Sequence, residues 1–220
     1  QYLGIAALMF DVGKMWVRDE LLLNPGTLTK SELDEVKKHV EYSVQIMSET
    51  RGITQLAVEA AATHHERFDG SGYPYGLKGG EIPLFGRMAG IVDFFDAVTS
   101  DRAHAAAMSP HAAIRHLYDL RNTQFQDELI EQFIQTLGVY PVGTLVELSN
   151  GEVGIVIGQN QVRRLRPKVI LVLDANKTPL DISPIRDLLV EDRDEHGNEL
   201  SIAATLEPGT YGIRPDEFYL

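Results

Sequence analysis

Ionisable side chains interrupt the apolar helical segments of this chain, and their placement limits how the chain can fold. Asp11 follows the apolar run AALMF, His39 shares a helical face with Val36 and Val40, and Asp93 lies inside AGIVDFF. An ionised carboxylate that is buried without a partner costs several kcal/mol, so each acid requires a cation, a hydrogen-bond donor or a metal. The fold must therefore bring suitable partners to these positions.

The pair His64 and His65 stands at the end of an apolar segment, directly before the glycine-broken stretch FDGSGYP. Adjacent residues on a helix point about 100° apart, so the two rings cannot share one narrow face. Both rings are explained if they converge on something small in the interior. The alternative is one buried, hydrogen-bonded histidine beside one solvated histidine, and this stretch alone favours that alternative slightly.

Taken singly, each of these polar residues has an ordinary explanation, such as a helix cap, a hydrogen-bonded core histidine or a buried ion pair. Taken together, two acids and three imidazoles form a mixed oxygen and nitrogen set that suits iron, manganese or zinc. A carboxylate in such a set can bridge two metals, and four helices would each bring one or two ligands to the centre. The remaining alternative is a metal-free, hydrogen-bonded core.

The pattern along the chain predicts a mainly α protein with a small β-rich part at the end. Residues 1–138 carry helical periodicity, including a capping box from Thr29 to Glu32, and Gly138 is expected to end the last helix. Residues 139–220 hold β-branched runs, and Asn150-Gly151 is a hairpin signal between two of them. We therefore predict a helical domain over 1–138 and a small β-barrel or sheet over 139–220. The helical segments are expected at 2–11, 28–49, 53–68, 84–107, 108–120 and 125–138.

Composition narrows the classes of function. The net charge of −12 and the pI near 5.0 argue against binding to DNA or to anionic membrane, which requires a basic face. No apolar run is long enough to span a bilayer, and the absence of cysteine fits a reducing compartment, so we expect a cytoplasmic protein. Because the chain opens at Gln1 and enters an apolar segment at once, we expect upstream helices and a sensor or receiver domain to be missing from it.

Four sequence blocks together resemble the HD-GYP branch of the HD phosphohydrolases. The blocks are FDVGK, KKHVEYS, HHERFDGSGYPYGLKGGEIPLFGR and IVDFFDAVTSDR, and the resemblance covers residues 3–137. Members of this family are bacterial metal-dependent phosphodiesterases that hydrolyse cyclic di-GMP. They use two or three metals, often iron or manganese, on an all-helical bundle. The resemblance implies this fold and this signalling function for residues 3–137.

The resemblance also implies roles for particular residues. Asp11 matches the aspartate that bridges two metals and takes part in catalysis, and Lys14 and Arg102 match cations that hold the scissile phosphate. The further metal ligands are implied to be His39, His64, His65 and Asp93. The signature loop, implied to position the site and to contact a signalling protein, contains Asp69, Gly70, Gly72, Tyr73 and Pro74.

Three positions depart from the family pattern. Phe10 stands where the histidine of the HD pair should be, Ser43 replaces a glycine, and Ala105 stands where a second phosphate-side cation is usual. A phenyl ring cannot coordinate a metal, so we expect one divalent metal site rather than two. We therefore expect reduced or lost phosphodiesterase activity toward cyclic di-GMP or a related phosphodiester. The alternative is a non-catalytic module that binds cyclic di-GMP or a protein.

Two further expectations concern residues near these motifs. Glu66 and Arg67 are expected to fix the signature loop through ion pairs. Trp16 is expected in the core, because a lone aromatic residue after a loop usually packs inside.

Overall fold

The computed structural model describes residues 2–101 and 106–218, and the chain forms two compact units. The first unit comprises Gln1–Ala106 and Leu117–Glu131, and the second comprises Ala107–His116 and Gln132–Leu220. The two helices α7 (Pro110–Asp119) and α8 (Asp127–Leu137) therefore each contribute residues to both units. The domain boundary after Gly138 stays a prediction.

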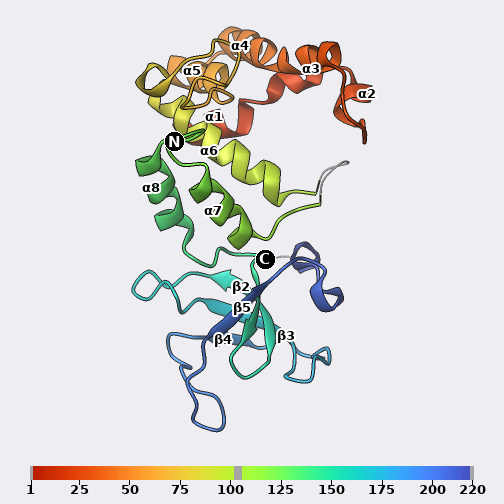
Figure 1. Cartoon of the computed structure of the whole chain (residues 1–220), viewed down its shortest axis with the longest axis vertical. Helices are drawn as coiled ribbons and strands as arrows, with labels where there is room; N and C mark the ends of the chain where they lie inside the picture. Colours follow the sequence, from red (N-terminus) through yellow and green to blue (C-terminus); the bar gives the residue numbers. More distant parts are fainter. Residues whose placement is uncertain (1, 102–105, 219–220) are drawn as a thin grey trace. The chain divides into compact units, whose positions relative to one another are not determined.

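The first unit is helical, as the sequence pattern predicts (Figure 1). Short 3-10 helices lie between some of the α-helices. The elements before α7 are α1 (Tyr2–Met9), η1 (Val12–Trp16), α2 (Asp19–Leu22), α3 (Lys30–Lys37), α4 (His39–Glu49), α5 (Gln55–Thr63), η2 (Gly79–Glu81) and α6 (Leu84–Thr99).

The helix predicted over 84–107 ends at Thr99, and two other differences from the sequence prediction place histidines at helix ends. The capping box at Thr29 is confirmed, but the single helix expected over 28–49 is wrong, because the helix breaks between α3 and α4. His39 is consequently the first residue of α4. The helix expected over 53–68 ends at Thr63, so His64 and His65 lie just beyond α5 rather than within it.

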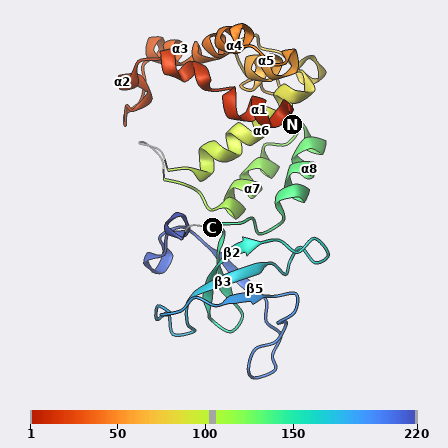
Figure 2. The same ribbon diagram turned by 180° about the vertical axis from the view of Figure 1, so that it is seen from behind.

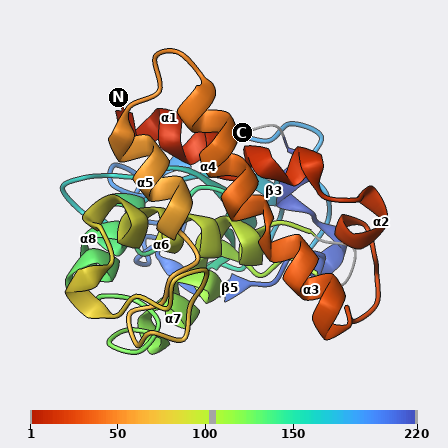
Figure 3. The ribbon, with the colours of Figure 1, turned by 90° about the horizontal axis from the view of Figure 1, so that it is seen from above.

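Small residues let the helices of the first unit approach closely. Helix α4 packs against η1 and α5, and α5 packs against α1 and α6, an arrangement that Figure 3 shows from above. The buried apolar cluster between them includes Phe10 and Met47 together with four alanines. Gly13 lies against α4, where an added Cβ would overlap the His39 carbonyl oxygen and the Ser43 backbone nitrogen.

The second unit is built on a five-stranded antiparallel sheet (Figure 2). The predicted hairpin at Asn150-Gly151 is confirmed, since β1 and β2 pair antiparallel and Gly151 has φ of +87°. Buried apolar side chains cover both faces of the sheet. The short β4 was not predicted, because three residues carry too little periodicity. The strand order is β4-β3-β2-β1-β5, with β1 (Leu145–Leu148), β2 (Val153–Gly158), β3 (Lys168–Leu173), β4 (Ile185–Asp187) and β5 (Ile202–Leu206).

Two 3-10 turns, η3 (Thr210–Gly212) and η4 (Pro215–Glu217), follow the last strand. Across the described residues, every helix is too short or too polar to cross a membrane.

The contact between Gly13 and α4 yields a prediction about stability. Gly13→Ala should lower the free energy of unfolding by about 2 kcal/mol or more, because the new methyl group overlaps backbone atoms that cannot rotate away. Gly80→Ala is the matched control, since a Cβ there meets open space. Urea unfolding of both variants measures the difference. Equal stability of the two variants would show that η1 does not pack against α4 as described.

Candidate metal centre

Asp11 stands between α1 and η1, where its two carboxylate oxygens face different partners. A 3-10 helix has three residues per turn, so Lys14 shares a face with Asp11, and its Nζ lies 2.5 Å from Asp11 Oδ2. The other oxygen, Oδ1, lies 3.2 Å from His39 Nε2 and 3.7 Å from His64 Nε2. The carboxylate therefore connects an ammonium group to a pair of imidazoles.

The contacts of Nδ1 in His39 and His64 show which ring nitrogen carries the hydrogen. His39 Nδ1 lies 2.7 Å from the Val36 carbonyl oxygen, and His64 Nδ1 lies 2.8 Å from the Ala61 carbonyl oxygen. A carbonyl oxygen can only accept, so Nδ1 carries the hydrogen in both rings. In the neutral rings Nε2 is then a bare lone pair, and both lone pairs face the Asp11 carboxylate.

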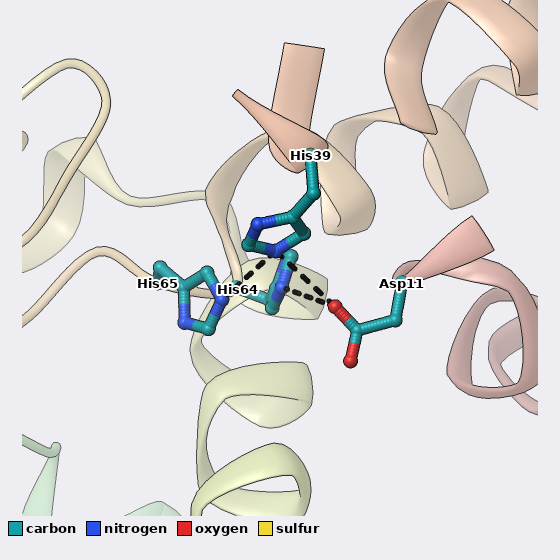
Figure 4. A group of neighbouring side chains, drawn as sticks. All are labelled: Asp11, His39, His64 and His65. Atoms are coloured by element: carbon teal, nitrogen blue, oxygen red, sulfur yellow. Dashed lines mark hydrogen bonds and ion pairs between the residues drawn. The ribbon is translucent and has the colours of Figure 1, made fainter. Parts of the chain in front are cut away.

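His65 brings a third imidazole to the same place, as Figure 4 shows. Its Nε2 lies 3.1 Å from His39 Nε2. Burial is the largest cause and the neighbouring His64 and His39 add to it, and together they lower the pKa of His65 from its ordinary 6.5 to about 2, so the ring is neutral at pH 7. The ligand atoms of Asp11, His39, His64 and His65 all lie within 4.8 Å of one another.

This set of atoms fits a divalent metal. Asp11 Oδ1 and His64 Nε2 are buried polar atoms without a hydrogen-bond partner, and both point into the cluster. Burial alone would raise the pKa of Asp11, but the hydrogen bond and positive charge of Lys14 lower it, and the pKa lies below its ordinary value, so the carboxylate stays ionised. Converging lone pairs with few hydrogens between them could hold a cation, and imidazole nitrogen with carboxylate oxygen suits iron, manganese or zinc.

Asp93, the fifth predicted ligand, lies on α6 at the far side of the His65 ring. Its Oδ2 is 3.6 Å from His65 Nδ1, whereas the cluster faces His65 Nε2. Burial raises the pKa of Asp93, and the nearby Asp11 raises it further, although His64, Lys14 and Arg67 act in the opposite direction. In this geometry Asp93 lies beside the Nδ1 edge of His65 and not among the cluster atoms, and its role as a direct ligand stays a prediction.

The signature loop packs over this cluster. Tyr73 stacks on His65 with ring centroids 4.7 Å apart, and Lys37 Nζ lies 4.8 Å from the centroid of the Tyr73 ring. An added Cβ at Gly72 would overlap the backbone of Glu66 and Arg67, so only glycine lets the loop return this close. The loop thereby shields one side of His65.

The beginning of the loop is a tight turn that its own residues define. Asp69 Oδ1 accepts a hydrogen bond of 2.9 Å from the Ser71 backbone N–H, and Gly70 has φ of +85°. The Tyr73–Pro74 peptide is cis, and Pro74 is exposed.

Glu66 fixes the loop by a means that differs from the prediction. Its buried carboxylate accepts hydrogen bonds from the backbone N–H groups of Tyr75, at 2.7 Å, and Leu77, at 3.0 Å. Arg67 donates to the His64 carbonyl oxygen at 3.2 Å and lies over the Phe125 ring. The predicted ion pairs are therefore wrong. Backbone N–H groups satisfy the Glu66 carboxylate, and the Arg67 guanidinium donates to a backbone carbonyl oxygen.

Two other sequence expectations have different outcomes. Arg102 lies outside the described residues, so its predicted role on the phosphate side stays a prediction. Trp16 was expected in the core, but 51% of it is exposed. The reason is that Gly13, and not the indole, makes the closest contact between η1 and α4.

Phe10 and Ser43, two of the departures from the family pattern, both border the cluster. The Phe10 ring is buried, with its centroid 4.7 Å from that of His64. Ser43 Oγ accepts a hydrogen bond of 2.8 Å from the Gly13 backbone N–H. Sequence reasoning missed this contact, although a serine one turn after His39 on a buried helical face was an available signal.

Comparison with known proteins identifies the family to which the chain belongs. The model of the HD domain matches residues 1–129, which confirms the family predicted from the motifs. A solved structure, an HDG"Y"P protein from Bdellovibrio bacteriovorus, has a TM-score of 0.50 and 18% identity over 62% of this chain and 43% of that chain. That likeness supports the fold alone.

Curated relatives agree with the family match. A cyclic di-GMP phosphodiesterase of Pseudomonas aeruginosa is 37% identical over 178 residues, covering 80% of this chain and 43% of the relative. A cyclic di-GMP phosphodiesterase of Thermotoga maritima is 40% identical over 59% of this chain and 36% of its own. A 3'3'-cGAMP-specific phosphodiesterase of Vibrio cholerae is 38% identical over 59% of this chain and 25% of its own. The chain thus spans less than half the length of these curated relatives.

The converging lone pairs predict metal binding that depends on Asp11. The wild-type chain should bind close to one Mn²⁺ per chain in equilibrium dialysis. Asp11→Asn should weaken the affinity at least tenfold, because even residues that only support a ligand contribute 10–100-fold, about 1–3 kcal/mol. Asp34→Asn, which changes an exposed acid on α3, is the control. Equal metal affinity of the two variants would refute the centre.

The lowered pKa of His65 predicts how the metal-free protein responds to acid. Below pH 6.5 residue 65 becomes protonated in the unfolded chain, whereas in the folded chain it becomes protonated only near pH 2. Stability in the presence of a chelator should therefore fall as the pH drops below 6.5, with this site contributing up to about 1.4 kcal/mol per pH unit. Urea unfolding between pH 7 and pH 4 should show a shallower dependence for His65→Gln. An unchanged dependence would mean that the folded His65 also becomes protonated.

Proposed function

The chain belongs to the HD-domain family, and from this premise we propose that it is a bacterial signalling domain that hydrolyses cyclic di-GMP weakly at a single metal. The observation that carries the proposal is the convergence of the Asp11 carboxylate with the bare nitrogens of His39 and His64. The names of two relatives, both cyclic di-GMP phosphodiesterases, support the substrate. The metal is proposed to be iron or manganese, and the compartment the cytoplasm.

When bound, a divalent cation supplies Lewis-acid polarisation of a phosphoryl oxygen and lowers the pKa of water. Asp11, His39, His64 and His65 would hold the cation, and Asp93 would orient His65 through its Nδ1. The hydrogen bonds from Nδ1 of His39 and His64 to backbone carbonyls fix both rings with Nε2 directed at Asp11 Oδ1, where these residues would hold the cation. Ring orientation is therefore set before any ligand arrives.

Lys14 is the residue that would meet the substrate phosphate. Its Nζ is held by Asp11 Oδ2, yet 38% of the side chain is exposed, so the ammonium faces both the centre and the solvent. With a net charge of −12, the chain repels a substrate that carries two phosphates unless local cations offset that charge. Lys14 and, by the resemblance, Arg102 would provide that offset beside the cation.

Phe10 is the reason to propose weak rather than full activity. Its ring offers no lone pair and lies in the apolar cluster beside His64. A pair of cations stabilises both the attacking and the leaving oxygen in phosphoryl transfer, whereas one cation supports only part of that charge. The loss of a nitrogen at position 10 also favours a second candidate, a non-catalytic module that binds cyclic di-GMP without turnover.

The signature loop supports a further part of the proposal, which is contact with a signalling protein. Tyr75 on this loop is 62% exposed, while its backbone N–H donates a hydrogen bond to the Glu66 carboxylate. We propose that this signalling partner is a sensor or receiver domain and that it controls the site.

Replacing Phe10 tests what limits activity. Phe10→His should raise the metal content from one toward two per chain and increase hydrolysis of cyclic di-GMP at least tenfold, because the imidazole restores a ligand where the ring now lies. Burial lost at this position would cost on the order of 1–3 kcal/mol, which metal binding can offset. The measurements are metal analysis of anaerobic protein and chromatography of the hydrolysis products.

Phe10→Leu is the matched control, since it removes the ring without adding a ligand. Activity gained equally in both variants would point to relief of crowding instead of a rebuilt metal site. A wild-type chain that already holds two metals and turns over as fast as Phe10→His would overturn the account of Phe10. Phe10→His protein that binds cyclic di-GMP with two metals but never hydrolyses it would favour the non-catalytic module.

A further inference from the structure

Trp16 is an exposed aromatic residue close to the metal centre. It is the last residue of η1, the 3-10 helix that begins directly after Asp11, and 51% of it is exposed. In a helix of three residues per turn, Asp11 and Lys14 share one face, and Gly13 and Trp16 share the next. Gly13 is pressed against α4, so the indole also lies on the side that meets α4.

The contact between Trp16 and α4 fixes the indole beside the centre. The ring of Trp16 meets that of Tyr42 with centroids 5.5 Å apart and planes inclined by 64°. Tyr42 follows His39 by three residues on α4, which is about 4.5 Å along the helix axis. The aromatic pair therefore lies within one helical turn of a metal ligand. An edge contact of this kind orients the indole but leaves much of its surface uncovered.

We propose that Trp16 stacks on a purine base of the cyclic dinucleotide, which makes it a substrate-binding residue of this chain. The inference rests on the proposed function, because it takes the phosphodiester to lie at Lys14 and the metal centre. Lys14 precedes Trp16 by two residues, about 4 Å along the axis of η1, so a base attached to a phosphate at Lys14 comes within reach of the indole.

Stacking solves a charge problem that is particular to this chain. The net charge of −12 disfavours a dianionic ligand, and the cations proposed at the site are few. The attraction between a base and an indole needs no positive charge, and each stacked base contributes appreciable affinity. Unlike the attraction to Lys14, this part of the affinity is not screened by salt. Trp16 therefore adds affinity by a route that the acidity of the chain does not oppose.

The chain contains a single tryptophan, so its fluorescence reports on position 16 alone. The metal-loaded chain is titrated with cyclic di-GMP while calorimetry follows binding in parallel. We expect the fluorescence to change with the same midpoint as the calorimetric signal. Dimethyl phosphate, which carries the phosphodiester without a base, should leave the fluorescence unchanged.

Variants separate stacking from a structural role. Trp16→Ala should raise the dissociation constant and KM for cyclic di-GMP by about fivefold to a hundredfold, with kcat and metal content unchanged. Trp16→Phe should recover most of the affinity, since it keeps an aromatic face. Leu56→Ala, which trims another exposed apolar side chain on α5, should have no effect. The ratio between Trp16→Ala and wild type should persist at high salt.

The outcomes distinguish this inference from the proposed function. Cyclic di-GMP that binds wild type without altering Trp16 fluorescence, and binds Trp16→Ala equally well, would overturn the stacking role and leave the proposed function standing. A metal-loaded wild-type chain that binds no cyclic di-GMP would overturn both. A Trp16→Ala chain that loses its metal would assign Trp16 a structural role, provided that wild-type fluorescence is also silent.

Discussion

The candidate metal centre depends on two hydrogen bonds between histidine side chains and the backbone. His39 and His64 each donate from Nδ1 to a backbone carbonyl three residues earlier. These bonds fix the position of the hydrogen and the rotation of each ring, so both Nε2 lone pairs meet at Asp11 Oδ1. A carboxylate facing two bare imidazole nitrogens is unfavourable unless a cation stands between them. Both bonds are local, so the orientation of the two rings is set by the chain segments that carry them.

Close approach of the backbones brings the remaining parts into place. Gly13 lets η1 touch α4, and an added Cβ at Gly90 would lie 2.7 Å from the His64 carbonyl oxygen, so α6 also packs tightly against the end of α5. These contacts hold Asp11, His64 and Asp93 on three elements that are distant in sequence. The Ser43 hydroxyl adds a hydrogen bond at the first of the contacts. Gly13 and Gly90 thus allow the close distances between backbones that bring these polar side chains together.

The sequence predicted the residue types at the centre better than it predicted their geometry. The helical class, the capping box at Thr29 and the Asn150-Gly151 hairpin follow from local rules, and the structure has all three. The helix ends beside His39 and His64 carry no glycine or proline signal, and at each of them a histidine Nδ1 donates to a backbone carbonyl oxygen. Trp16 was wrongly expected in the core, because Gly13 makes the tight contact on the face of η1 that they share and much of the indole stays exposed. The sequence also could not show that Asp93 faces Nδ1 of His65, because that depends on how α6 packs against the residues after α5.

The most direct test of the metal centre is nitrogen NMR of histidine-labelled protein titrated with Zn²⁺, a diamagnetic stand-in that accepts the same nitrogen and oxygen ligands. The account predicts that the Nε2 resonances of His39, His64 and His65 shift together and saturate at one zinc per chain. It also predicts that Nδ1 of His39 and His64 keeps its hydrogen throughout. Resonances of these three residues that stay unchanged while zinc binds elsewhere, or coordination through Nδ1 of His39 or His64, would contradict it.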